Sequence, residues 1–488
     1  MSAGSLLGLA VRGVEVPAYD VASAPSPTLV HFGPGVFHRA HQAVYADTVL
    51  GTGSVSGAIC AVSLRSRELR DALSRQDHLY SLISRSNAGD RVRIIGSIRS
   101  SLVAPEDPEA VLRRLTDPAV TVVTITVTEK GYCAVGSTGD LDTSRSEVAH
   151  DIACPSAPLS LLGFLVEGLA RRRTAGVAPF TVASCDNLRS NGVATRRLVL
   201  ALAACRSSSL SDWIAGNVAF PSSMVDRMAP ASTEVARALL SSSFGYDDAE
   251  PVVTEPFSQW VLEDSFPSGR PPWELAGVEM VASVEPFEQA KLRILNGAHS
   301  AFAYFGLLSG HAEIASAAAD PVLRALVMCL LETEVIPTLE APAGMDLAAY
   351  AGQVVSCFEN RALGYTAAKV AGDGSQKLGV RILAAVRDRL AAGAGAEMLA
   401  AVVAAYAVCV LGPRAAELQV QDPALDRLLG GVREPAPDSE KAVDRLLGVA
   451  EIFGDLTHEP AFSEAVRKHA AALWDRDPRE VLTATGER

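Results

Sequence analysis

The stretch TLVHFGPGVFH, residues 28–38, decides the fold. Residues 28–32 are mostly β-branched and apolar, which predicts a buried strand, and the turn Gly33-Pro34-Gly35 follows it directly. A helical pattern begins after the turn. In a parallel α/β sheet, this succession lets the backbone approach a pyrophosphate group and directs a helix N-terminus at its charge. An ordinary tight turn is the alternative, because His38 stands where the third glycine of the usual dinucleotide fingerprint would be.

The rest of the chain divides into two kinds of pattern. Strand-like runs at 28–32, 58–64, 92–98, 120–128 and 180–184 alternate with helical patterns at 66–76, 108–115, 161–173 and 193–204. Such alternation predicts a Rossmann-type, doubly wound parallel sheet with helices on both faces, in an α/β domain over residues 1–281. From residue 282 onward, Ala- and Leu-rich helical segments predict a mostly α-helical C-terminal domain, residues 282–488.

Composition excludes several classes of function. The chain has 488 residues and a net charge of −13, which argues against general attraction to nucleic acid or to an anionic membrane. The longest apolar run, 398–411, is shorter than the roughly 20 residues that span a bilayer, so we expect a buried core helix there. No export signal is recognisable, and a cytoplasmic protein is expected. Eight scattered cysteines without a C-x-x-C pair predict reduced, mostly buried thiols and no metal site.

The cofactor expected at the glycine turn is a nicotinamide dinucleotide. The residues expected to contact it are Gly33, Gly35, Val36, Phe37, Arg39, Arg65, Arg67 and Glu68. The last three follow the second predicted strand, where an acidic side chain selects NAD and an arginine accommodates the phosphate of NADP. Because both kinds of residue are present, NAD is the expectation and NADP stays open. A solvated first helical turn is the alternative for these three charges.

A second chemical signal is KLRILNGAHS, residues 291–300. On a regular helix with about 100° per residue, Asn296 lies about 140° and His299 about 80° around from Lys291, so all three side chains can face one cleft. Removing hydride from an alcohol requires a base for the hydroxyl proton, and a buried lysine can supply it because burial lowers the pKa of an ammonium group. Solvated polar residues are the alternative, but the apolar residues between these positions predict a mostly buried helix.

Three polar islands interrupt apolar sequence at 184–187, 220–227 and 373–377. The first follows the strand predicted at 180–184, at the carboxyl end where doubly wound sheets bind ligands. By pattern alone, a turn with a local salt bridge is the favoured interpretation of each island.

Seven motifs that include these residues carry a resemblance to a known family. They are HFGPGVFHRAHQ, TVTEKGYC, SCDNLRSNG, FPSSMVDR, EPFSQWVLED, KLRILNGAHS and DGSQK, in this order from residue 31 to 377. Together they resemble the polyol-specific long-chain dehydrogenase (mannitol dehydrogenase) family, which includes mannitol 2-dehydrogenase, arabinitol dehydrogenase and fructuronate reductase. The resemblance implies a Rossmann-type domain, a helical C-terminal domain and an active site between them. It also implies metal-independent chemistry, a small sugar acid or polyol as the partner, and a monomer.

The resemblance also implies roles for individual residues. Lys291 would be the general acid/base, Asn187 and Asn296 would polarise the reacting oxygen, His299 would contact the substrate, and Glu129 could relay protons to solvent. The residues expected to line the substrate site are Lys130, Asp226, Arg293 and Lys377.

Within the family, the motifs are most similar to those of fructuronate reductases. TEKGY at 128–132, KLR at 291–293 and DGSQK at 373–377 resemble that branch. A uronate carries a carboxylate, which gives additional cations such as Lys130 or Arg293 a physical rationale. The interconversion of D-fructuronate and D-mannonate is therefore expected, with a neutral polyol dehydrogenase of the mannitol or arabinitol type as the alternative. A cofactor-retaining sugar epimerase and a sensor protein are remote alternatives.

Overall fold

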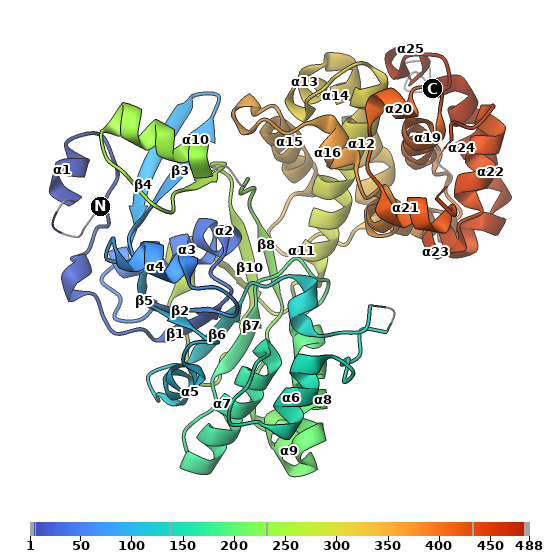
Figure 1. The fold of residues 1–488 in the computed structure, drawn as a ribbon. Helices are drawn as coiled ribbons and strands as arrows, with labels where there is room; N and C mark the ends of the chain where they lie inside the picture. Colours follow the sequence, from blue (N-terminus) through green and yellow to red (C-terminus); the bar gives the residue numbers. More distant parts are fainter. Residues whose placement is uncertain (1–3, 5, 137, 231–232, 432–433, 483–488) are drawn as a thin grey trace. The chain divides into compact units, whose positions relative to one another are not determined.

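The computed structural model describes residues 4, 6–136, 138–230, 233–431 and 434–482. Its chain divides into two compact units, Met1–Glu285 and Pro286–Arg488. The boundary lies four residues after the one expected from composition. Figure 1 shows strands concentrated in the first unit and helices throughout the second.

A five-stranded parallel sheet in the order β5-β2-β1-β6-β7 forms the centre of the first unit. Counted along the chain within this sheet, the order is 3-2-1-4-5, as in dinucleotide-binding Rossmann folds. The register places Leu29 of β1 opposite Ile59 of β2 and Val122 of β6. The point where strand order reverses therefore lies between β1 and β6, and such points are where α/β sheets bind ligands. The predicted α/β class with a helical C-terminal part is confirmed.

The elements of the first unit have well-defined bounds. Its parallel strands are β1 (Leu29–Phe32), β2 (Ile59–Ser63), β5 (Ile98–Val103), β6 (Val122–Ile125) and β7 (Thr181–Ser184). Its other strands are β3 (Tyr80–Ser86), β4 (Gly89–Ile95), β8 (Ser223–Asp226), β9 (Val252–Thr254), β10 (Gln259–Glu263) and β11 (Glu279–Val281). Its helices are α1 (Leu6–Ala10), α2 (Val36–Ala40), α3 (Gln42–Gly51), α4 (Glu68–Ser74), α5 (Pro108–Thr116), α6 (Ser146–Ala153), α7 (Leu161–Ala175), α8 (Asn191–Arg206), α9 (Ser208–Asn217) and α10 (Thr233–Leu239).

Alternation along the strands buries both faces of the parallel sheet. Val30 and Phe32 of β1 pack in a core with helices α5, α7 and α8, whereas Leu29 packs on the other side with α3 and Trp260. Figure 1 shows α3 and α5 on opposite sides of the sheet. Because both faces are covered, the strands read as continuous apolar runs in the sequence.

The predicted strand at 92–98 is wrong in its placement. Its first part belongs to β4, which pairs antiparallel with β3 outside the parallel sheet, and its last residue begins β5. Two further three-stranded sheets, β4-β3-β9 and β11-β10-β8, were not expected. Their strands are short or partly exposed, so their apolar periodicity is weak.

In the described part of the second unit, the secondary structure is helical apart from an isolated β-bridge between Glu313 and Thr366. Its helices are α11 (Glu285–Ala290, which begins at the unit boundary), α12 (Asn296–Leu308), α13 (Ile314–Ala319), α14 (Pro321–Leu330), α15 (Leu347–Phe358), α16 (Ala367–Ala371), α17 (Gly374–Leu378), α18 (Ala384–Ala391), α19 (Glu397–Leu411), α20 (Ala415–Leu418), α21 (Pro423–Leu428), α22 (Ser439–Leu447), α23 (Ala450–Phe453), α24 (Pro460–Leu473) and α25 (Pro478–Leu482). Residues 399–411 of α19 are all buried, so the expected core helix at 398–411 is confirmed. Helices α12 and α19 share one apolar core with most of the others.

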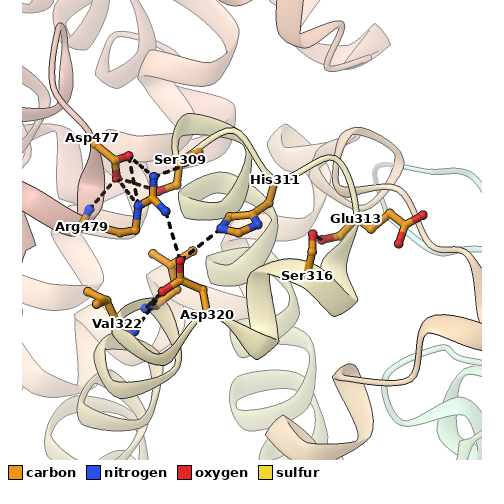
Figure 2. A network of polar contacts seen from close by, with 9 residues as sticks. Ser309, His311, Glu313, Ser316, Asp320, Val322, Asp477 and Arg479 are labelled. Carbon is orange, nitrogen blue, oxygen red and sulfur yellow. Dashed lines mark hydrogen bonds and ion pairs between the residues drawn. The ribbon is translucent and has the colours of Figure 1, made fainter. Parts of the chain in front are cut away.

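A polar network ties the C-terminal segment to the end of α12 (Figure 2). Asp320 accepts hydrogen bonds from Val322 N and Leu323 N at the start of α14, and it pairs with His311 Nε2 at 3.2 Å. Arg479 contacts the same carboxylate at 3.3 Å. Asp320 therefore caps one helix and holds two distant segments.

Further features of the described residues bear on function. All eight cysteines are free thiols, but only Cys60, Cys133, Cys185 and Cys409 are buried, so fewer are buried than expected. None of the helices in the described part of the chain is long and apolar enough to cross a membrane. The same residues contain no group of three or more His, Cys, Asp or Glu side chains that could hold a metal ion.

We predict that Asp320→Ala lowers the free energy of unfolding by about 2 to 3 kcal/mol. Loss of the cap costs about 1 kcal/mol, and loss of the partly buried contacts to His311 and Arg479 adds the rest. Asp346→Ala is the matched control because Asp346 caps α15 through Ala348 N and Ala349 N only. Urea unfolding of both variants measures the difference, and equal losses would contradict a role for Asp320 beyond capping.

Candidate functional site

The glycine turn after β1 has the geometry that a pyrophosphate requires. Gly33 adopts φ +86°, and a Cβ there would overlap the backbone carbonyl of Thr126, so only glycine fits. A Cβ at Gly35 would meet nothing nearer than Gly33 O at 4.0 Å, so the space beside the turn is open. Helix α2 begins at Val36, and the N–H groups of its first turn, including those of Val36 and Phe37, have no acceptor within the helix. These groups fit the phosphates of a dinucleotide.

His38 explains how the turn works without a third glycine. Its ring stacks on that of His31 in β1, with centroids 3.3 Å apart and planes 14° from parallel. The third glycine of the usual fingerprint serves close packing of helix against strand. Here two flat rings provide that packing, and burial keeps them neutral, lowering the pKa of His31 to about 3.

The charged residues predicted at the cofactor site fall into two groups. Arg39 is buried and directed away from the turn: its guanidinium donates to Glu250 O at 2.6 Å and to Glu250 Oε2 at 3.1 Å. Arg65, Arg67 and Glu68 are exposed and follow the end of β2, beside β1. Arg67 lies 3.6 Å from Asp71 Oδ2 and 3.9 Å from Glu106 Oε1, whereas Arg65 has no partner among the described residues.

A buried carboxylate, Asp186, organises the carboxyl ends of β6 and β7. Asp186 Oδ1 accepts from Val127 N at 2.9 Å, and Oδ2 accepts from the Tyr132 hydroxyl at 2.5 Å. These two contacts fix both ends of the short turn Glu129–Tyr132, on which Glu129 and Lys130 are exposed. Asn187 follows Asp186 directly and is also exposed. The structure therefore brings Glu129, Lys130 and Asn187 to one edge of the parallel sheet.

Asn191 connects this edge to β8. Its Nδ2 donates to Asp186 O at 2.9 Å and to Ser223 O at 2.8 Å, and its Oδ1 accepts from Ser223 N at 2.9 Å. Ser223 begins β8, whose last residue is the predicted Asp226. This buried polar network thus joins the elements that carry the substrate and catalytic residues predicted in the first unit.

Burial shifts two carboxyl groups of the first unit toward neutral pH. Desolvation raises the pKa of Asp186 to about 7, against the lowering effect of its hydrogen bonds. Desolvation also raises the pKa of Glu255 to about 7, and the neighbouring charge of Asp226 adds to the rise. Groups that titrate near the working pH gather at functional sites.

In the second unit, Lys291 lies in a widened helical turn. Residues Lys291–Leu295 form a π-helical turn, in which Asn296 N donates to Lys291 O. Residue i+5 then occupies the place above residue i that residue i+4 takes in an α-helix. Asn296 therefore stands above Lys291, and the offset of about 140° expected for a regular helix does not apply. His299 follows three residues after Asn296 on α12, so the widened turn also changes the offset of about 80° that a regular helix would give it.

The predicted cations of the second unit separate in the structure. Lys377 lies close enough to His299 that its charge, with that of Arg381, adds to desolvation in lowering the pKa of His299 to about 3. Arg293 is buried elsewhere: its guanidinium contacts Thr338 Oγ1 at 2.8 Å and Asp388 Oδ2 at 2.6 Å. The lysine-bearing face thus holds Lys291, Asn296 and His299 with Lys377 nearby, without Arg293.

Sequence reasoning missed two residues of this site, Asp186 and Arg381. Asp186 lay inside the quoted island SCDN, and its place at the end of a buried strand was the signal that pointed to it. Arg381 follows Lys377 by four residues and donates to Ser300 Oγ at 3.0 Å and Asn296 O at 3.4 Å. Nothing in the local pattern separates Arg381 from the other arginines of that segment.

Comparison with known proteins agrees with this geometry. Residues 27–275 match the mannitol dehydrogenase Rossmann domain, and residues 283–474 match the mannitol dehydrogenase C-terminal domain. The chain belongs to the mannitol dehydrogenase family. The resemblance inferred from the seven motifs is thereby confirmed, and the protein is an oxidoreductase of the polyol and sugar-acid dehydrogenase class.

Individual members of the mannitol dehydrogenase family are similar over nearly the whole chain. An uncharacterised oxidoreductase of Escherichia coli, YeiQ, is 41% identical over 460 residues, 93% of each chain. The D-mannonate oxidoreductase of E. coli is 39% identical over 96% of this chain and 98% of its own length. Among solved structures, the Pseudomonas fluorescens mannitol 2-dehydrogenase in ternary complex with NAD and D-mannitol has a TM-score of 0.81 and 36% identity, covering 100% of this chain and 99% of that one.

We predict that the stability of the Asp186→Asn variant relative to wild type increases with pH. The folded-state pKa of Asp186, about 7, lies above the reference value of 3.8, so folding binds a proton between these pH values. In wild type, protonation of Asp186 stabilises the folded state fully below about pH 4. This stabilisation is lost as pH rises to 7, and the loss is up to about 1.4 kcal/mol for each unit by which the folded-state pKa exceeds the reference value. Asparagine stays neutral and avoids the loss.

Melting temperatures at pH 5.5 and 8.5 measure this effect. Ser223→Ala is the control, because it removes a hydroxyl that donates to Ser184 O in the same network without removing a titratable group or a contact of the Asp186 carboxylate. The difference in melting temperature between this control variant and wild type should be the same at both pH values. If the difference in melting temperature between Asp186→Asn and wild type does not change with pH, the raised pKa of Asp186 is contradicted.

Proposed function

We propose that this protein is a metal-independent, NAD-dependent dehydrogenase that interconverts D-fructuronate and D-mannonate, a ketone and a secondary alcohol on a linear sugar acid. The observation that carries the proposal is the turn that aligns Lys291, Asn296 and His299 on one helix. The 39% identity with a D-mannonate oxidoreductase over nearly the full length of both chains supports the choice of substrate. A monomer is part of the same proposal.

In this proposal the first unit binds the cofactor. The open glycine turn and the first turn of α2 hold the phosphates, and residues 65–68 meet the adenosine ribose. When bound, the nicotinamide accepts or donates the hydride at the reacting carbon. Glu129 and Asn187, both exposed at the edge of the sheet, serve proton relay and polarisation of the reacting oxygen.

The second unit supplies the acid/base chemistry. The Lys291 amine takes the hydroxyl proton during oxidation and returns it during reduction. The Asn296 side chain, directly above Lys291 on the helix, donates a hydrogen bond to the oxygen as negative charge develops. His299 stays neutral at physiological pH, since desolvation lowers its pKa to about 3, so its ring can donate to a substrate hydroxyl. Lys377 and Asp226 are the further proposed substrate contacts.

A neutral polyol such as D-mannitol is the second candidate substrate. The similarity to a mannitol 2-dehydrogenase of known structure favours it. Initial rates with D-fructuronate, D-tagaturonate, D-fructose, D-mannitol and D-arabinitol, each with its matching cofactor form, separate the two candidates. Stoichiometric change at the absorbance band of the reduced nicotinamide separates both from a cofactor-retaining epimerase.

We expect Lys291→Ala to lower kcat about 10²- to 10⁴-fold at neutral pH, because a positioned acid/base contributes that much. The affinity for NAD, measured by quenching of tryptophan fluorescence, should stay within about twofold. Lys441→Ala is the control: Lys441 is an exposed lysine of α22 that approaches Asp438. Near wild-type turnover in Lys291→Ala would contradict the assigned mechanism.

For the cofactor, we expect a higher kcat/KM with NAD than with NADP. The exposed Arg65 has no partner among the described residues and can meet a 2′-phosphate, so Arg65→Ala should reduce kcat/KM for NADP about two- to fivefold and leave NAD unchanged. Arg67→Ala should change the ratio less, since Asp71 and Glu106 already flank Arg67. A strong preference of the wild-type enzyme for NADP would overturn the NAD assignment.

A further inference from the structure

We infer that Arg381 binds the carboxylate of the sugar-acid substrate, with Lys377 beside it, and so distinguishes sugar acids from neutral polyols. This inference rests on the proposed function, because it assigns the group that reads the charge of that substrate. It also replaces Lys130 and Arg293 as the cation expected at this position.

The first support is where the guanidinium lies. Arg381 belongs to a second π-helical turn, Gly379–Leu383, and its Nη1 donates to Ser300 Oγ at 3.0 Å and to Asn296 O at 3.4 Å. Asn296 and Ser300 flank His299 on α12. The guanidinium therefore lies along the same stretch of helix as the proposed substrate contacts.

The second support is the lack of a counter-ion. In the part of the chain that the structure describes, no carboxylate lies within ion-pair distance of Arg381, and its Nε and Nη2 donate to no described residue. Two other arginines of the second unit have carboxylate partners: Arg387 lies 2.7 Å from Asp455 Oδ1, and Arg293 lies 2.6 Å from Asp388 Oδ2. A partly buried charge without a carboxylate partner lowers stability unless a ligand compensates it.

The third support is the electrostatic environment. Desolvation lowers the pKa of Arg381, and desolvation together with the Arg381 charge lowers the pKa of Lys377. Lys377 has Asp373 at 3.9 Å as its carboxylate neighbour, and the charge of Asp422 also acts on it. His299 feels both cations. Both carboxylates thus act on Lys377, whereas none in the described part of the chain acts on Arg381, whose charge a bound anion would neutralise.

The chemistry of the side chain selects the kind of anion. A guanidinium presents donors in a planar fork that matches a carboxylate, and with Nη1 held by Ser300 the Nε and Nη2 edge remains for a bidentate contact. Lys130, in contrast, is exposed on a short turn, where a single charge contact contributes little. Arg293 already has Asp388 and Thr338 as partners.

D-Mannonate and D-mannitol are the probes, because they differ only by a carboxylate in place of a hydroxymethyl group. Their dissociation constants are measured by calorimetry on the full-length enzyme saturated with NADH, which forms a complex that cannot react. We expect Arg381→Gln to weaken D-mannonate about tenfold to a hundredfold and D-mannitol by less than about threefold. The KM for D-fructuronate should rise in parallel, with kcat little changed.

Three further variants complete the design. Arg387→Gln is the matched control, an arginine of the next turn paired with Asp455, and should leave both constants unchanged. Ser300→Ala removes the hydroxyl that accepts from Arg381 and should weaken D-mannonate selectively by a few fold, which keeps the test available if Arg381→Gln does not fold. Lys130→Gly tests the alternative cation.

The outcomes separate this inference from the proposed function. If the wild-type enzyme binds the two probes equally, the sugar-acid assignment fails, and the carboxylate role of Arg381 fails with it. If the wild-type enzyme prefers D-mannonate and Arg381→Gln keeps that preference, only the Arg381 assignment is overturned. Equal losses for both probes in Arg381→Gln and Ser300→Ala would show a structural role instead, and a selective loss in Lys130→Gly alone would move the carboxylate to Lys130.

Discussion

The hydrogen bond from Asn296 N to Lys291 O sets the arrangement on which the catalytic helix depends. One extra residue in this turn places Asn296 above Lys291 on the helix. In a regular α-helix the two residues would lie about 140° apart around the helix axis. Gly297 follows at once, and a Cβ there would lie 3.3 Å from Arg381 O, so the missing side chain lets the segment that carries Arg381 approach closely. The widened turn and the glycine together determine which polar groups can meet on α12.

The first unit achieves a similar result by different means. Its exposed functional groups, Glu129, Lys130 and Asn187, stand on a buried carboxylate rather than on an altered helix. Asp186 loses hydration on burial, and its bonds to Val127 N and Tyr132 OH offset only part of that loss, so its pKa stays raised. The same bonds leave the turn Glu129–Tyr132 little freedom. In both units, buried polar contacts fix the positions of side chains that must remain accessible.

The sequence predicted four of the five parallel strands, the main covering helices and the glycine turn, because burial on both faces leaves apolar runs that end at recognisable turns. It did not predict β8 or β10, whose alternation is short, and it merged β4 with β5 because Gly96 and Ser97 are a weak break. Within the site, it identified the residue types but not the directions of side chains. Arg39 was expected to contact the cofactor because it follows the glycine turn, and Arg293 was expected at the substrate site because of the family resemblance and its charge. Glu250 and Asp388, remote in sequence, bind their guanidinium groups. Such partners depend on tertiary structure.

Pairing of arginines by acidic residues is expected in a chain with 56 Asp and Glu against 43 Lys and Arg. In such a chain many carboxylates are available to pair with a partly buried guanidinium, and leaving the guanidinium unpaired lowers stability. Arg381 nevertheless makes its side-chain contacts with a hydroxyl and a backbone carbonyl, both neutral, among the described residues. Neutral acceptors fix the direction of the guanidinium while leaving its charge uncompensated. The buried Arg172 also donates only to backbone carbonyls, but it uses all three of its guanidinium nitrogens for these contacts. In Arg381, Nε and Nη2 donate to no described residue, and this difference favours a binding role over a purely structural one.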